Sequence, residues 1–229
     1  MMREALAIAG KDFRLEARTR ERLSSMVIFS LMVVLSFRFA FGFFDIHVDQ
    51  VQESRSIVAA ILWVTFFFAG MLGLAPAFAK EADAGTMGGL LLVPTNRFAL
   101  YLGKLASSLV FIFVVSLSTL IFFAVFFNYD YSGQWGPLIA VTLLGTLGYS
   151  SIGVTVSALS SSAKTRDILL PMLLITVALF TVIVPSINAT AGLLSGDIDA
   201  VVSNVVYVGA FTVIALLLSY LLFDDIVED

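Results

Sequence analysis

Residues 105–127 read LASSLVFIFVVSLSTLIFFAVFF, an apolar run that contains no charged side chain. A helix needs about 20 mostly apolar residues to cross the hydrocarbon core of a bilayer, so this run can span a membrane. Five further runs meet the same criterion, and the six predicted spans are 26–44, 57–78, 105–127, 138–159, 168–187 and 201–223. Strands of a membrane β-barrel would alternate polar and apolar residues, and these runs do not. The sequence therefore predicts an all-α polytopic bundle of six transmembrane helices in a single domain, residues 1–229.

The composition of the chain excludes several classes of protein. Of the 229 residues, 59% are apolar and 13% charged, and the mean hydropathy is +1.00. A soluble domain carries about 25% charged residues, so a soluble enzyme is excluded. The net charge of −4 and the lack of an extended basic tract argue against a nucleic-acid partner. Without cysteine and with one histidine, a single copy cannot form a thiolate or histidine-rich metal site, and we expect no stably bound cofactor.

The sequence also lacks the motifs of an enzyme. It contains no phosphate-binding Gly-x-x-x-x-Gly-Lys-Ser/Thr loop and no recognisable Ser/His/Asp set. We therefore expect no catalysis by this chain, and any ATP hydrolysis would take place on a separate partner subunit.

The basic residues predict the orientation in the membrane. They gather before the first predicted span, between the second and third, and between the fourth and fifth: Arg3, Lys11, Arg14, Arg18, Arg20, Arg22, Lys80, Arg97, Lys104, Lys164 and Arg166. Because Lys and Arg resist translocation, these segments and both termini are predicted to be cytoplasmic. A signal peptide cleaved near Ala40 is the alternative, and the long charged leader and Arg38 argue against it.

Residues 2–22 are predicted to form an amphipathic helix on the membrane surface. At 100° per residue, Met2, Leu6 and Phe13 share one face with Ala9 and Ala17. The basic residues Lys11, Arg14, Arg18 and Arg22 share a flank that would lie among anionic head groups. The helix is either a generic surface anchor or an elbow that transmits motion to the first span.

The most informative polar segment is 80–104, which reads KEADAGTMGGLLLVPTNRFALYLGK. It is too long for a hairpin connection, and the apolar run 90–93 would be costly to leave in water. Pro94 would end any helix that begins near Lys80, and Tyr101 and Lys104 are expected to anchor the next span at the interface. The segment is therefore either a docking surface for a partner or an ordinary cytoplasmic loop.

The pattern in this segment resembles that of the cytochrome c maturation protein B family (CcmB, heme exporter protein B). The pattern is Glu81-x-x-x-Gly85-Thr86, then Leu90-Leu91-Leu92-x-Pro94, then Tyr101-x-Gly103-Lys104. The opening KDFRLE (11–16), the run LLGTLG (143–148) and the closing LFDDIVE (222–228) support the resemblance. Residues 87–89 read MGG, where the family often has a leucine and an acidic residue. The resemblance covers essentially the whole chain.

The resemblance implies a six-span ABC-2 type permease in the prokaryotic cell (inner) membrane. Its implied partners are a CcmA-like cytoplasmic ATPase, a CcmC-like heme-handling membrane protein and a CcmE-like heme chaperone, with membrane lipids and a possible homodimer. ATP hydrolysis would drive export of heme, as substrate rather than cofactor, or release of the heme-loaded chaperone. An ABC-2 permease for a lipid, drug or glycan is one alternative; a non-transporting scaffold that relays ATPase motion is another. The expected ATPase-coupling residues are Glu81, Asp83, Gly85, Thr86, Leu90, Leu91, Leu92, Pro94, Lys164 and Arg166.

Arg38 is the only formal charge well inside a predicted span. Leaving its guanidinium unpaired in the membrane costs at least ~2.5 kcal/mol, so the side chain needs either water or a polar partner. It either extends to the outer interface or faces a cavity, where its partner would be anionic, such as a carboxylate or a heme propionate.

Further side chains are expected to have structural roles. His47 is predicted to be a solvated loop residue, and Trp63 and Trp135 to be interfacial. The phenylalanine clusters 66–68, 122–123 and 126–127 are expected to face lipid rather than to cradle a porphyrin. The small residues of span 138–159 predict tight packing, Pro76 and Pro171 predict kinks, and 186–200 is expected to be a short re-entrant or interfacial element.

Overall fold

A computed structural model describes residues 2–43, 54–75, 77–78, 97–131, 133–161 and 166–228. The described elements are all helical: α1 (Met2–Thr19), α2 (Glu21–Phe43), α4 (Arg55–Leu74), α7 (Arg97–Phe127), α8 (Trp135–Ser161), α9 (Arg166–Ala178), the π-helix η1 (Leu179–Ile183), α10 (Val184–Ser195) and α11 (Ile198–Glu228). No strand occurs within these described ranges. The predicted all-α class is confirmed.

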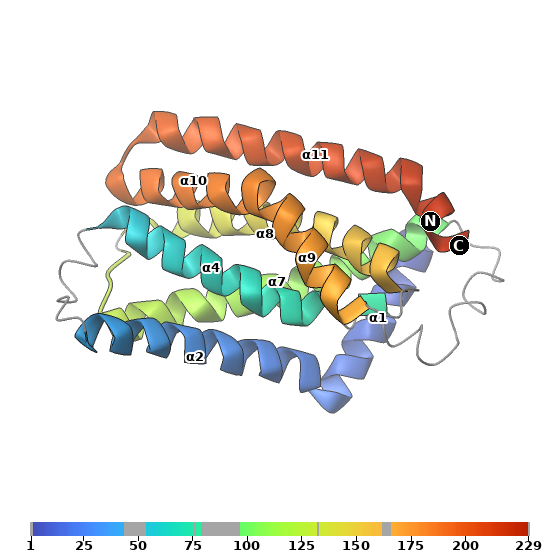
Figure 1. The fold of residues 1–229 in the computed structure, drawn as a ribbon, viewed down its shortest axis with the longest axis horizontal. Helices are drawn as coiled ribbons and strands as arrows, with labels where there is room; N and C mark the ends of the chain where they lie inside the picture. Colours follow the sequence, from blue (N-terminus) through green and yellow to red (C-terminus); the bar gives the residue numbers. More distant parts are fainter. Residues whose placement is uncertain are drawn as a thin grey trace.

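Six helices of the described part are long and apolar enough to cross a membrane. They cover Glu21–Gly42, Arg55–Leu74, Phe98–Phe127, Trp135–Ser160, Ile168–Ser195 and Ile198–Leu221. They run side by side along the long axis, while α1 lies across one end of the bundle (Figure 1). The start of α1 and the end of α11 lie at that same end, as an even number of spans requires (Figure 1). The prediction of a six-span bundle is therefore confirmed.

The fifth span differs from the prediction for 186–200. The chain continues through η1 into α10 and stays helical to Ser195, so it forms no re-entrant element there. Pro185 explains the wider π turn: it has no N–H, and its ring would clash with the carbonyl four residues earlier, that of Thr181 within η1. The visible change of direction in the span lies at η1, beyond Pro171 (Figure 1).

A left-handed glycine ends this span. Gly196 has a φ of 79°, and its N–H and that of Asp197 bond to the carbonyls of Leu193 (3.2 Å) and Gly192 (2.8 Å). The carboxylate of Asp197 then accepts a 3.0 Å bond from the N–H of Ala200 at the start of α11. The turn between α10 and α11 is therefore capped on both sides.

The helix α8 packs against α4, α7, α9, α10 and α11, and its glycines make this possible. A Cβ atom on Gly148 would lie 2.6 Å from the Thr212 hydroxyl of α11. A Cβ on Gly145 or Gly153 would overlap with a side chain of α4, Trp63 or Leu74 respectively. The small residues of this span therefore form the close-packed face that the sequence predicted.

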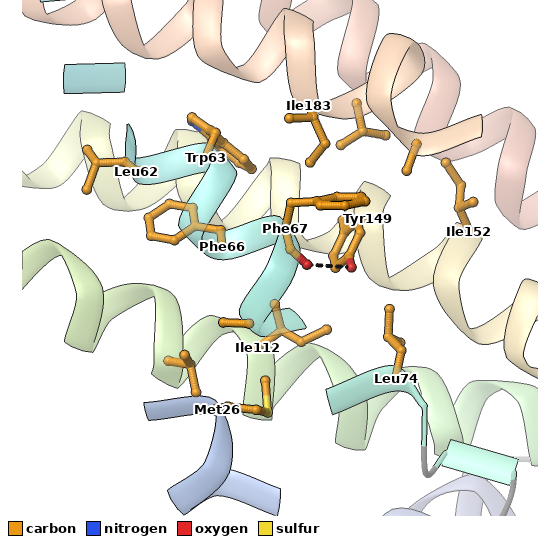
Figure 2. Close-up of a cluster of buried hydrophobic side chains, with 14 of the residues drawn as sticks. Met26, Leu62, Trp63, Phe66, Phe67, Leu74, Ile112, Tyr149, Ile152 and Ile183 are labelled. Atoms are coloured by element: carbon orange, nitrogen blue, oxygen red, sulfur yellow. Dashed lines mark hydrogen bonds between the residues drawn. The ribbon is translucent and has the colours of Figure 1, made fainter. Parts of the chain in front are cut away.

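The core between α4 and α8 is aromatic (Figure 2). The hydroxyl of Tyr149 donates a 2.9 Å bond to the carbonyl of Phe67, and the rings of Phe67 and Tyr149 are 5.5 Å apart. Trp63 was predicted to be interfacial, but it is 1% exposed and belongs to the core. Phe66, Phe67, Phe123 and Phe127 are buried as well, so only part of each phenylalanine cluster faces lipid. The sequence shows that these residues are apolar and lie within spans. It does not show which of them a neighbouring helix covers.

Candidate functional site at the junction of α1, α2 and α7

Most of the predicted ATPase-coupling residues lie outside the described residues. These are Glu81, Asp83, Gly85, Thr86, Leu90, Leu91, Leu92, Pro94 and Lys164. Arg166 begins α9, and its side chain is outside the described part. The third part of the sequence pattern, Tyr101-x-Gly103-Lys104, lies in the first turns of α7 and is fully described. These turns hold α1 and the start of α2.

Lys104 forms a buried ion pair with Asp12 of α1. The Lys104 ammonium lies 3.3 Å from one carboxylate oxygen of Asp12 and donates a 3.4 Å hydrogen bond to the other. The hydroxyl of Ser107 donates a 3.1 Å bond to the same carboxylate. The side chain of Lys104 is 4% exposed and that of Asp12 11%, so the two charges stabilise each other, and Lys11 adds a second, more exposed ammonium 3.8 Å from the Asp12 carboxylate. Lys104 is therefore not the interfacial anchor that the sequence suggested.

Gly103 lets α1 approach α7 closely. A Cβ atom at this position would lie 2.8 Å from the Cβ of Ile8 and 2.9 Å from the carbonyl oxygen of Ala5. Tyr101, which is also fully buried, donates a 3.2 Å bond to the carbonyl of Ser151 in α8. The three residues of the pattern thus join α7 to two different helices.

Glu16 fixes the angle between α1 and α2. Arg20 connects the two helices in the left-handed region with a φ of 52°, and its N–H bonds to the carbonyl of Glu16 at 2.7 Å. The carboxylate of Glu16, which is 5% exposed, accepts a 2.7 Å bond from the N–H of Leu23 in the first turn of α2. An acidic side chain at a helix N-terminus satisfies a free N–H and interacts favourably with the helix dipole. The amphipathic segment is therefore divided: α1 ends at Thr19, and residues 21–22 belong to α2.

Arg22 turns inward from this elbow. Its guanidinium donates a 3.1 Å bond to the Ser108 hydroxyl and lies 4.7 Å from the centre of the Phe111 ring, both on α7. Phe13 of α1 packs edge-on against the same ring, with centroids 5.2 Å apart. A single helical wheel had placed Arg22 on the basic flank, but the break at Arg20 changes its direction. Asp12 and Glu16 were not among the functional residues predicted from the sequence, although their spacing of four residues puts them on one face, opposite the basic row.

Arg38 lies at the far end of α2. Its Nε donates a 3.2 Å bond to the carbonyl of Phe126 in the last turn of α7, where carbonyls lack an intrahelical partner. The partner is thus a helix C-terminus, which carries partial negative charge. The predicted role of Arg38 in a cavity stays a prediction, and His47 lies outside the described residues.

Aromatic residues gather at this far end as well. Arg55 donates a 2.6 Å bond to the hydroxyl of Tyr129, whose ring is 4.8 Å from that of Tyr131. Tyr131 packs in turn on Trp135, with ring centroids 5.0 Å apart. Burial raises the pKa of the Tyr131 hydroxyl well above its usual range, and Tyr129 adds to the shift. We therefore expect Tyr131 to stay neutral over the physiological pH range.

The described residues contain no group of three or more His, Cys, Asp or Glu side chains that could hold a metal ion. Cavities do lie between the described helices. One, of 560 Å³, is lined by α1, α2 and α7 at the elbow. Another, of 240 Å³, is almost wholly apolar and lies between α8, α9, η1 and α11.

Comparison with known proteins identifies the family of the chain. The family model described as CcmB protein matches residues 3–227, which is nearly the whole sequence. No curated protein matches the chain with significant similarity. The match includes the junction of α1, α2 and α7 and all six spans. The protein therefore belongs to the CcmB family, the multi-pass membrane components of the heme exporter for cytochrome c maturation.

Proposed function

We propose that this chain is the permease subunit of an ABC-type complex, in which a separate CcmA-like ATPase drives heme export or release of a heme-loaded CcmE-like chaperone. A CcmC-like heme-handling protein would be the membrane partner. Family membership supports the membrane role in heme export. The observation that supports mechanical coupling is the buried pair of Asp12 and Lys104, because it joins α1 to the first turns of α7.

The position of this pair suggests how force would travel. The segment 80–104, which carries most of the proposed docking residues, leads directly into α7 at Arg97. A few turns into α7, Lys104 holds α1 and Ser108 holds Arg22 of α2. Apolar helix faces can slide past one another, whereas buried charged contacts have one favourable geometry. A displacement imposed by the ATPase would therefore move α1 and α2 together with α7.

In this proposal the end of the bundle that carries α1 is cytoplasmic. It carries most of the basic residues, which supports the orientation with both termini inside. The docking surface would consist of the residues expected from the sequence: Glu81, Asp83, Gly85, Thr86, Leu90, Leu91, Leu92, Pro94, Lys164 and Arg166. Charged members would set the register of the ATPase, and the leucines would supply most of the affinity.

The test separates docking from coupling. Glu81→Lys, or Leu91 and Leu92 both changed to serine, should reduce co-purification of the ATPase without lowering the amount of membrane subunit. Asp12→Asn combined with Lys104→Gln should keep ATPase binding but lower the yield of mature cytochrome c, because the pair is replaced by two neutral groups. The matched control is Arg14→Gln on the exposed side of α1.

Two outcomes would contradict the proposal. Normal ATPase binding by both docking variants would place the contact elsewhere. Normal cytochrome c maturation in the double variant of Asp12 and Lys104 would show that the pair only stabilises the fold. Transport of heme by the purified complex into vesicles distinguishes a permease from a scaffold that relays motion to another subunit.

A further inference from the structure

The acidic and basic side chains of α1 lie on opposite sides of the helix. Asp12 and Glu16 point inward and are bound by α7 and α2. The basic side chains of the helix are all exposed: Arg3, Lys11, Arg14 and Arg18. A helix that contains both signs of charge in its sequence therefore presents a basic row on its outer surface. Such a row is complementary to an anionic membrane surface.

An apolar flank lies beside this basic row. Met2 is 79% exposed and Leu6 is 67% exposed, and at 100° per residue Phe13 and Ala17 lie on the same side. Side chains of this kind would be unfavourable in water, and the boundary between head groups and acyl chains accommodates them. The exposed members of this flank, Met2, Leu6 and Ala17, are thus suited to contact lipid while the basic row remains at head-group level, whereas Phe13 packs on Phe111 of α7.

The elbow cavity borders this apolar side of α1. Its wall includes Phe13 and Ala17 from the apolar flank, together with residues of α2 and α7. From the connection into α2 the cavity is lined in turn by Arg20, by Leu23 and Ser24, and by Val27, so a cation lies at the start of α2 and hydrocarbon lies two turns further on. Because α2 is long and apolar enough to span the membrane, this order of lining residues runs from the membrane surface toward the membrane interior. Phe111 of α7 closes the apolar part.

Glu16 is the acidic group in this wall. One oxygen of its carboxylate is engaged by the N–H of Leu23, so part of its charge is directed at the N-terminus of α2. Arg20 also lines the cavity, and it is exposed. The cation thus lies where a head group would enter, and the carboxylate is turned toward the backbone.

We propose that the elbow cavity binds one anionic phospholipid, with its phosphate at Arg20 and an acyl chain along Phe13, Val27 and Phe111. The gradient from charge to hydrocarbon matches the molecule in both polarity and direction. A protein segment could fill the same space, but the position of the cavity beside a lipid-facing flank favours a lipid. A bound lipid would hold the angle between α1 and α2 (Figure 1). The proposal does not depend on which substrate the complex transports.

The experiment places a tryptophan in the cavity. The full chain with Phe13→Trp is reconstituted into vesicles of equal parts phosphatidylcholine and phosphatidylglycerol, and only one of the two lipids carries brominated acyl chains. Both vesicles have the same surface charge and the same bromine content. The unsubstituted chain supplies the background from Trp63 and Trp135. We expect brominated phosphatidylglycerol to quench the fluorescence of the introduced tryptophan with about fivefold higher occupancy, the factor one cation near an anionic surface provides.

Matched variants test the role of Arg20. In the Phe13→Trp background, Arg20→Asn removes the cation with a residue that tolerates the left-handed backbone, and it should abolish the preference. Arg20→Lys should retain it. Arg3→Gln removes the same charge from α1 outside the cavity and should leave the preference unchanged. Native mass spectrometry of the unsubstituted chain should detect one retained phosphatidylglycerol that the Arg20→Asn chain lacks.

Each of three results would contradict the proposal that the elbow cavity binds an anionic phospholipid. Equal quenching by the two brominated lipids would mean that the cavity does not select an anionic lipid. Absence of quenching by either would mean that something other than lipid fills it. An equal loss in the Arg3 and Arg20 variants would reduce the effect to general surface attraction.

Discussion

The indole N–H of Trp63 in α4 donates a 2.8 Å hydrogen bond to the hydroxyl of Thr190 in α10, and both side chains are buried. The two residues are 127 positions apart, so the bond joins the second span to the second half of the fifth. In a membrane, where every helix surface is apolar, such a bond fixes the rotation of one helix against another.

We expect Trp63→Phe to lower the stability of the folded protein by about 1–2 kcal/mol, because it removes this bond and leaves part of the site empty. Thermal unfolding in detergent, followed by circular dichroism, measures the effect. Trp135→Phe is the control, since Trp135 is 41% exposed at the start of α8 and should change stability little. Equal stability of the two variants would contradict the role assigned to the Trp63–Thr190 bond.

Gly103→Ala should displace α1 from α7. Its new methyl group would meet Ile8 and the carbonyl of Ala5 at distances of 2.8–2.9 Å, and overpacking of this kind costs about 1–3 kcal/mol. Limited proteolysis should then cut α1 faster than in the unsubstituted protein. Gly10→Ala in α1 is the matched control, because nothing lies within 4 Å of its Cβ position. That substitution should leave the cutting rate unchanged or reduce it, as alanine favours helix.

Arg38→Leu should impair cytochrome c maturation while the protein still assembles. The change removes the donor to the Phe126 carbonyl at the C-terminus of α7, so the ends of α2 and α7 lose their polar link. Arg38→Lys retains the positive charge at this helix end and should restore part of the activity. The measurement is the amount of mature cytochrome c against the amount of membrane subunit. Full activity of Arg38→Leu would leave the residue with an interfacial role alone.

Cysteine labelling tests the predicted orientation in this cysteine-free chain. Cysteines at Thr19 and Thr165 should react with an impermeant reagent only after the cells are opened. A cysteine at Asp130, beyond the end of α7, and one at Ser195, the exposed last residue of α10, should react in intact cells. Asn188 is less suitable because it lies inside the fifth span. Reaction of the Thr19 cysteine in intact cells would reverse the orientation.

The sequence predicted the features that depend on the bilayer alone. Length and hydropathy determine the number of spans, and glycines on α8 indicate close packing; the structure confirms both. Features that depend on a distant partner were not predicted. The burial of Lys104 requires Asp12 to fold back over α7, and a basic residue near a span end looks the same in sequence whether it anchors or pairs.

Local backbone geometry accounts for the remaining differences. The left-handed Arg20 breaks what appears in sequence as one helix, and no glycine or asparagine marks the position. The segment 186–200 contains polar and small residues that favour an irregular element, but residues 186–195 continue α10, where the Thr190 hydroxyl accepts the bond from Trp63 of α4. The predicted coupling residues, which lie mostly outside the described part, stay predictions.

The π-helix η1 has a consequence for the faces of the fifth span. A π turn accommodates about one residue more than an α turn, and one residue corresponds to about 100° of rotation. The side chains of α9 are therefore rotated by about that angle relative to a continuous α-helix extended back from α10. The span thus presents one side to its neighbours in one leaflet and a different side in the other. Two short helical wheels, joined with an offset at residues 179–183, describe it better than one.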